Sequence, residues 1–246
     1  MTKKKVLSKN KYHLLRKIGA ILIIVSTIIG VFGLLLAKVK VGSVSCLSQI
    51  GTCNSETLFR IDNVKGHDII TTKKILASEL SKDIFVEEYA IRYRIPNSYQ
   101  VSLVEREPKY ILKSSKNSWS AIVDKNGIVL SLGEKATEYP AILTDADLLN
   151  PGEKVDDTKF FALNIAYSLF TYYNVTKTGI IIADGVVFEL ADGMKVIFPL
   201  AGDREALLGS LALVLNRLNN ADRNFTIDGK TSFSELDLRY KNPILR

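Results

Sequence analysis

The chain has 246 residues, of which 47% are hydrophobic and 24% are charged, so it can bury a core and does not have the composition of a disordered chain. Its formal net charge is +7. Seven of the 33 basic residues lie within residues 1–17, which contain no acid, leaving 26 basic against 26 acidic residues in the remainder. A neutral remainder lacks the basic stripe that binds a phosphate backbone, so no nucleic-acid partner is expected.

Residues 18–37 read IGAILIIVSTIIGVFGLLLA, which is 20 uncharged and mostly apolar residues. A helix of this length crosses about 30 Å of hydrocarbon, so the segment predicts one transmembrane helix. The basic tail at 1–17 places the N-terminus in the cytoplasm and the remaining domains outside it. A cleaved signal peptide is the alternative, although its apolar part is normally only about 7 to 15 residues long. The expected protein is a single-pass type II protein of the cytoplasmic membrane.

Residues 38–56 are rich in glycine and serine and contain the only two cysteines, Cys46 and Cys53. We expect an extracytoplasmic stalk here. In an oxidising compartment a disulfide between these cysteines is plausible. Two free thiols in a flexible linker are the alternative, and two cysteines without further ligands do not predict a metal site.

The periodicity from residue 58 onward is that of a small α+β domain. Residues 59–64 predict a strand and residues 71–80 a short helix with one apolar side. Alternating apolar and polar residues at 89–95 and 99–105, joined at Pro96, then predict a two-stranded hairpin.

A second domain follows, and its pattern predicts an antiparallel sheet backed by helices. Asp203 is placed to cap the second helix. The last strand is expected to lie at the edge of the sheet. In chain order the predicted elements are a hairpin at 121–130 that turns at 124–127, a helix at 157–173, strands at 179–183, 186–190 and 194–200, a helix after Asp203, and strands at 224–227 and 235–240.

Four sequence pieces carry a resemblance to a known family. Residues 96–108, PNSYQVSLVEREP, resemble the pattern P-x-x-L-x-V-x-V-x-E-R-x-P, with Tyr99 and Leu103 at its Leu and its second Val. VDKNG at 123–127, LADG at 190–193 and LDLRY at 236–240 come after it in the order V-D-x-x-G, L-x-D-G and (V/I)-D-L-R-Y. Together these pieces resemble the FtsQ/DivIB cell-division proteins.

The resemblance implies a domain plan for the whole chain. In the family a short basic cytoplasmic tail and one span precede a POTRA domain and a β-domain. Here the tail is 1–17, the span 18–37 and the stalk 38–56, followed by a POTRA-like domain at 57–112 and a β-domain at 113–246. The expected fold class is therefore α+β, with a single N-terminal transmembrane helix, a POTRA-like domain and an antiparallel β-domain with packed helices.

By resemblance, such a protein is a non-enzymatic scaffold of the divisome at the division septum. It would join small bitopic proteins of the FtsB/DivIC and FtsL kinds to the septal peptidoglycan synthase complex, with no cofactor and no small-molecule substrate. An exposed edge strand would receive a partner strand, with Leu238, Arg239 and Tyr240 as contacts. An ordinary edge strand with an outward arginine and a packed tyrosine is the alternative. Glu105 and Arg106 would form a surface for other divisome proteins, or else a structural salt bridge.

An enzyme is the less favoured reading of the sequence. His13 lies in the basic tail, so His67, after a turn glycine, is the only histidine outside it. The sequence contains no H-E-x-x-H, G-x-S-x-G or phosphate-binding glycine loop. Asp184 and Asp192 could form a carboxylate pair, but they sit beside glycines where turns favour Asp. A POTRA-type transport or chaperone module and a cell-envelope hydrolase remain the alternative functions.

Overall fold

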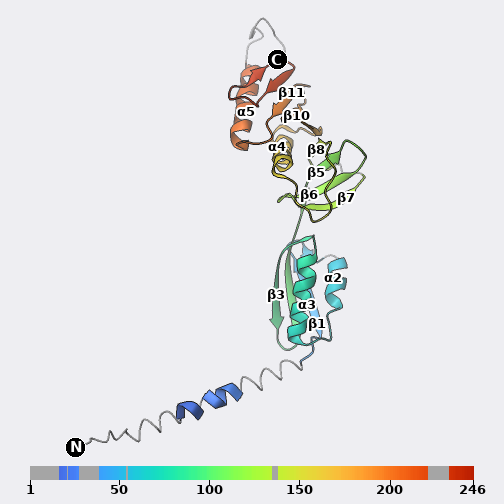
Figure 1. Cartoon of the computed structure of the whole chain (residues 1–246), viewed down its shortest axis with the longest axis vertical. Coiled ribbons are helices and arrows are strands. Elements are labelled where there is room, and N and C mark those ends of the chain that lie inside the picture. The colour runs from blue at the N-terminus through green and yellow to red at the C-terminus, as the bar shows by residue number, and fades with distance from the viewer. Residues whose placement is uncertain (1–16, 21, 28–38, 54, 135–137, 221–232) are drawn as a thin grey trace, which may run out of the picture. The chain divides into compact units, whose positions relative to one another are not determined.

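A computed structural model describes residues 17–20, 22–27, 39–53, 55–134, 138–220 and 233–246. The chain divides into two compact units, Met1–Glu105 and Arg106–Arg246 (Figure 1). The domain boundary expected after residue 112 falls inside a strand, β5 (Pro108–Ser114), which belongs to the second unit.

The prediction of a transmembrane helix at 18–37 has to be corrected. In the part of the chain that the structure describes, no helix combines the length and the apolar character needed to cross a membrane. Described helical residues in this region are 17–20 and 22–27, while residues 21 and 28–37 of the expected span lie outside the description. The predicted single-pass location in the cytoplasmic membrane, with extracytoplasmic domains, depended on that helix and is overturned with it.

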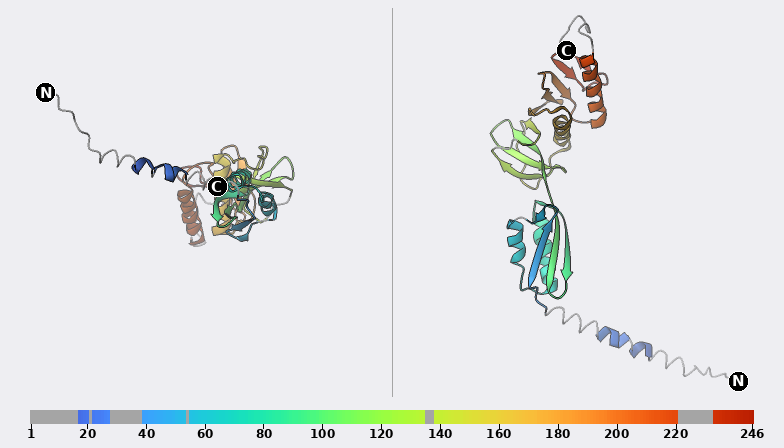
Figure 2. Two further views of the ribbon diagram at one scale, coloured as in Figure 1. Left: turned by 90° about the horizontal axis from the view of Figure 1, so that it is seen from below. Right: turned by 180° about the vertical axis from the view of Figure 1, so that it is seen from behind.

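The first unit is a four-stranded sheet with two helices on one face (Figure 2). Its strand order is β2-β1-β4-β3, where β1 pairs with β4 in parallel and β4 pairs with β3 antiparallel. Its elements are β1 (Ser43–Ser48), β2 (Gly51–Thr52), α2 (Ser55–Asp62), α3 (Ile69–Lys82), β3 (Val86–Arg94) and β4 (Ser98–Glu105).

Two expectations for this unit were wrong. The stalk expected at 38–56 is wrong, because its residues 43–48 form β1, which pairs with β4 along its whole length and supplies the first strand. The strand expected at 59–64 is helical instead, mostly within α2. Thr57, Ile61 and Val64 are all buried, and their spacing of four and three residues is that of one helix face.

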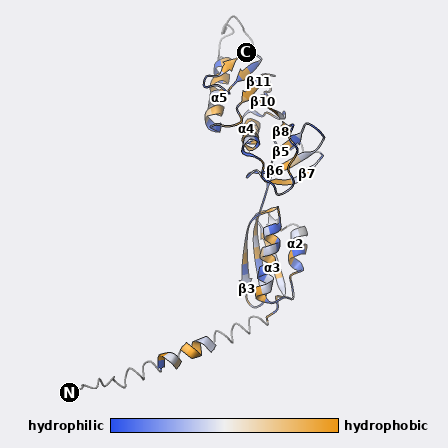
Figure 3. Cartoon of the chain, viewed as in Figure 1, coloured by the Kyte–Doolittle hydropathy of each residue, from blue (hydrophilic) through white to orange (hydrophobic). Residues whose placement is uncertain are grey.

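The helix α3 was predicted, and its start has a clear cause. The Asp68 carboxylate accepts the backbone N–H groups of Ile70 and Thr71, both at 3.0 Å. This satisfies two of the donors that the first turn of a helix leaves unpaired. Figure 3 shows hydrophobic and hydrophilic residues alternating along α3, and Leu76 and Leu80 are buried against the sheet.

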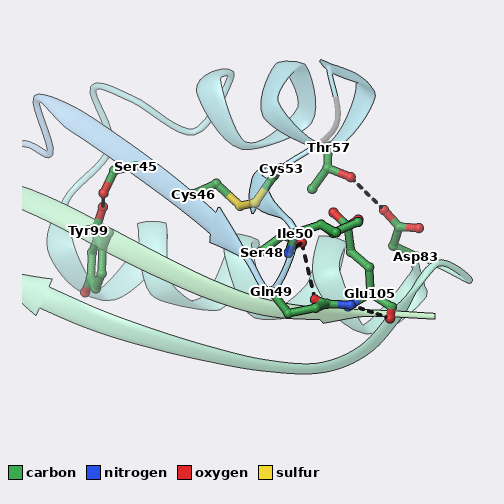
Figure 4. Close-up of a disulfide and its surroundings, with 10 residues drawn as sticks. All are labelled: Ser45, Cys46, Ser48, Gln49, Ile50, Cys53, Thr57, Asp83, Tyr99 and Glu105. Carbon is green, nitrogen blue, oxygen red and sulfur yellow. Dashed lines mark hydrogen bonds between the residues drawn. A yellow bond between two sulfur atoms is a disulfide. The ribbon is translucent and has the colours of Figure 1, made fainter. Parts of the chain in front are cut away.

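A disulfide between Cys46 and Cys53 ties β1 to the start of α2 (Figure 4). Both cysteines are buried in the core of the first unit, and the chain holds no free cysteine. Closing a loop of this size restricts the unfolded chain and stabilises the fold by about 2 to 3 kcal/mol. Beside it, the Gln49 side chain exchanges two hydrogen bonds of 2.8 Å with the Glu105 backbone.

The second unit contains a nine-stranded sheet in the order β13-β12-β11-β10-β9-β8-β5-β6-β7. Its core joins the sheet to α4 and α5 through Tyr110, Leu163, Phe188, Phe198 and Leu211. In addition to β5, its elements are β6 (Ser120–Asp124), β7 (Val129–Gly133), β8 (Ala141–Thr144), α4 (Asp157–Tyr173), β9 (Gly179–Ile182), β10 (Gly185–Glu189), β11 (Lys195–Phe198), α5 (Arg204–Asn220), β12 (Glu235–Asp237) and β13 (Ile244–Leu245).

The antiparallel sheet expected for this unit is a mixed sheet. Two helices connect strands that run in the same direction, α4 between β8 and β9 and α5 between β11 and β12. A crossover of this kind makes neighbouring strands parallel, and β5 also pairs with β8 in parallel. The strand expected at 224–227 lies outside the described residues.

Candidate partner-binding site

The expected contact residues follow β12, and this strand is not an edge. It pairs in parallel with β11 and, on its other side, antiparallel with β13. The strand predicted at 235–240 therefore stops at Asp237, and the edge of the sheet is the two-residue strand β13. Its backbone is held by hydrogen bonds between Arg246 and Glu235 in both directions.

Leu238 is a core residue. Its side chain is only 3% exposed and packs within the core of the second unit. Its backbone N–H donates to the carbonyl of Ile197 at 2.8 Å. Leu238 therefore serves the core first and offers a partner almost no side-chain surface.

Arg239 is already paired within its own unit. Its Nε and Nη2 donate to the two carboxylate oxygens of Asp237 at 2.9 and 2.6 Å, and its Nη1 lies 2.5 Å from Asp184. Hydrogen bonds from this guanidinium hold the pKa of the fully buried Asp237 below its ordinary value, against the effect of burial. The predicted pairing of Arg239 with a partner carboxylate would have to compete with these two acids.

Tyr240 is the exposed member of the three, with 53% of its surface accessible. The Arg239 guanidinium carbon lies 5.9 Å from the centre of its ring, within the range of a cation–π contact. Tyr240 thus presents an aromatic surface beside a side chain that two ion pairs hold in place.

A groove of about 340 Å³ opens next to Tyr240. One wall is the segment that joins β12 to β13, and the other is the loop after β11 with the first turns of α5. Asp203 caps that helix by accepting the N–H groups of Glu205 and Ala206 at 2.9 and 3.2 Å. The lining residues are Pro199, Ala201, Gly202, Asp203, Ala206, Leu207, Ser210, Leu238, Arg239, Tyr240, Lys241 and Pro243.

Arg106 forms an ion pair with a buried carboxylate of the second unit. Its Nη1 donates at 2.8 Å to the carboxylate of Asp124, which is 1% exposed. The other oxygen of Asp124 accepts the N–H groups of Asn126 and Ile128, both at 2.8 Å. Arg106 and the turn at 124–127 therefore form one polar cluster, which agrees with the salt-bridge alternative for this residue.

Glu105 lies at the end of β4, in the first unit. Its backbone is bound to the Gln49 side chain, as Figure 4 shows. Its Oε1 atom is buried and has no hydrogen-bond partner among the described residues. Glu105 and Arg106 are therefore engaged in different contacts, one in each unit.

Within the described ranges, no group of three or more His, Cys, Asp or Glu residues is arranged to hold a metal ion. Asp184 and Asp192, the carboxylates considered for catalysis, have separate partners. Asp184 pairs with Arg239, and Asp192 accepts the backbone N–H of Met194 at 3.0 Å.

The sequence analysis did not predict that Asp184, Lys241 and the strand β13 would lie around Arg239 and Tyr240. One signal was available, because side chains two residues apart in a strand lie on the same face, where the acidic Asp237 can be paired. An arginine two residues later is its natural partner. No comparable signal marks a two-residue strand.

Comparison with known proteins gave no match. No protein-family model matches the chain, and none of the curated proteins compared with it matches either.

Proposed function

We propose that the chain is a non-enzymatic scaffold of the bacterial division machinery. It joins small coiled-coil division proteins of the FtsB/DivIC and FtsL kinds to the septal peptidoglycan synthase complex. The resemblance of four sequence pieces to FtsQ/DivIB proteins supports this proposal. The structural observation that carries it is the half-exposed Tyr240 beside the groove between α5 and the β12–β13 segment.

The groove suits a partner segment because its walls are preformed. Leu238 is anchored in the core, and Arg239 is held by Asp237 and Asp184. Fixed walls reduce the conformational entropy that binding removes. An exposed tyrosine above such a groove supplies apolar area together with a hydroxyl, the combination found at interface hot spots.

The proposed mode of binding differs from direct pairing with residues 235–240. A partner segment binds in the groove, whose lining includes Pro243 immediately before the edge strand β13. Lys241 lines the groove and has no ion-pair partner among the described residues, so it takes the role first assigned to Arg239 and attracts an acidic partner residue.

Site-specific photo-crosslinking in living cells tests this proposal. A photoreactive residue replaces Tyr240, and the matched control carries it at Tyr172, which is 74% exposed on α4. The captured proteins are identified by mass spectrometry. We expect small coiled-coil division proteins from position 240 and none from position 172. Equal capture at both positions, or no such protein at position 240 of a folded chain, overturns the proposal.

A further inference from the structure

The strand β3 is a long open edge in the first unit. It is nine residues long and lies at the end of the strand order, so among the described residues its only sheet neighbour is β4 (Figure 1). An open edge presents a row of unpaired N–H and C=O groups to another strand. Most native edges of this length are shortened, bulged or covered, and from Glu88 to Arg94 the pairing of β3 with β4 is regular.

The charges on β3 are arranged with opposite signs about its centre. Glu88 and Arg92 are exposed on the face of the sheet that points away from the helices, with Ala90 between them. Neither charged side chain has an ion-pair partner among the described residues. Tyr89 and Ile91 alternate with them on the helix side, and Tyr89 is 40% exposed.

We propose that β3 pairs antiparallel with β3 of a second copy of this chain, with the two-fold axis at Ala90. In this register Glu88 of each copy lies opposite Arg92 of the other, which forms two equivalent cross-strand ion pairs. Tyr89 lies opposite Ile91, so apolar surface at the edge becomes covered. The two four-stranded sheets become one continuous sheet of eight strands.

The chemistry favours this register over its neighbour. A shift that centres the axis on Ile91 places Glu88 opposite Arg94 and leaves Arg92 opposite Ala90. The Arg94 guanidinium already donates to Gln100 Oε1 at 3.0 and 2.8 Å, and Arg92 would lose its counter-charge. The Ala90-centred register neutralises both unpaired charges and places the smallest side chain where the strands cross the axis. This inference concerns the first unit and does not rest on the proposed function.

Charge reversal tests the pairing in the full chain by sedimentation velocity over a range of concentrations. Glu88→Arg and Arg92→Glu each place like charges opposite one another and should raise the dimer dissociation constant at least tenfold. The double variant restores opposite charges and should restore the dimer. Lys154→Glu is the control, because it reverses an exposed charge in the second unit, which does not contain β3. Association that both single reversals leave intact, or a chain that stays monomeric throughout, overturns the inference.

Cysteine crosslinking tests the register. Both native cysteines are in the disulfide, so a new cysteine is the only free thiol. Ala90→Cys places two thiols across the axis and should give a covalent dimer under mild oxidation. Ser102→Cys is the control, since Ser102 faces Ala90 from β4 and its copies would lie about 14 Å apart. Equal crosslinking of the two variants contradicts the register.

Discussion

Two buried aspartates in the second unit depend on arginines that are close in sequence or structure. Asp124 is 1% exposed and Asp237 is fully buried, and each accepts a guanidinium hydrogen bond, from Arg106 and Arg239 respectively. A carboxylate in such a place is destabilising unless it is paired and hydrogen-bonded. Arg106, Asp237 and Arg239 in the E-R-x-P and D-L-R-Y pieces are therefore first of all structural, and this limits which of them can contact a partner.

Arg106→Ala should strongly destabilise the second unit. The substitution leaves one oxygen of the buried Asp124 without its partner, and breaking a buried pair from one side costs about 3 kcal/mol. The measurement is the free energy of unfolding in urea. Lys177→Ala is the control, because Lys177 pairs with Glu189 at the surface and should lose less than about 1 kcal/mol. Equal losses would show that the buried pair is not important for stability.

The pKa of Asp237 predicts a dependence of stability on pH. Hydrogen bonds from Arg239 lower this pKa in the folded protein, whereas an unfolded Asp titrates near about 3.9. The stabilisation is therefore present above about pH 4 and is lost as the pH falls through the lower folded pKa. The difference in urea-unfolding free energy between the wild type and Asp237→Asn should be constant from pH 7 to 5 and shrink below pH 4. A difference that grows towards acid contradicts this assignment.

Among the elements of the second unit, the parallel strand pairs of the large sheet depend on close packing at the point where the chain leaves a crossover helix and enters the next strand. After α4 the chain enters β9 at Gly179, directly beside the Phe188 ring on β10. A Cβ atom at Gly179 would lie 2.2 Å from Phe188 Cε1, well inside van der Waals contact. The return from α4 into the sheet thus requires a residue without a side chain.

Gly179→Ala should therefore destabilise the second unit by about 2 kcal/mol, the usual effect of overpacking a core. Gly209→Ala on α5 is the matched control, since nothing lies within 4 Å of a Cβ atom there. It should stabilise the unit by about 0.5 to 1 kcal/mol, because alanine favours a helix more than glycine does. Thermal unfolding of the two variants measures both effects. Equal shifts of the same sign would contradict the packing described at Gly179.

The whole chain consists of two units with separate cores. The sequence predicted the helices of the second unit more accurately than the strands of the first. The helix at 157–173 was predicted to the residue, because its apolar spacing is a local signal. The Asp203 cap of α5 was predicted for the same reason.

What could not be predicted from the sequence depends on distant pairing. The strand β1 pairs with β4, and Val44 lies opposite Tyr99, 55 positions later. Without that pairing, residues 38–56 have the composition of a linker. In the site, Tyr240 was correctly placed at the surface, whereas Leu238 is buried because it packs against core residues that are distant in the sequence.

If the groove beside Tyr240 binds a partner, as proposed, a side chain that fills the groove should weaken binding. Ala206→Arg places a long side chain in the groove from the first turns of α5, and Ala212→Arg places the same side chain on an exposed position of α5 away from the groove. Binding of each full-length variant to a purified FtsB/DivIC-like protein is measured by titration. We expect at least tenfold weaker binding for Ala206→Arg and unchanged binding for Ala212→Arg. Equal affinities for the wild type and Ala206→Arg would show that the partner does not bind in the groove.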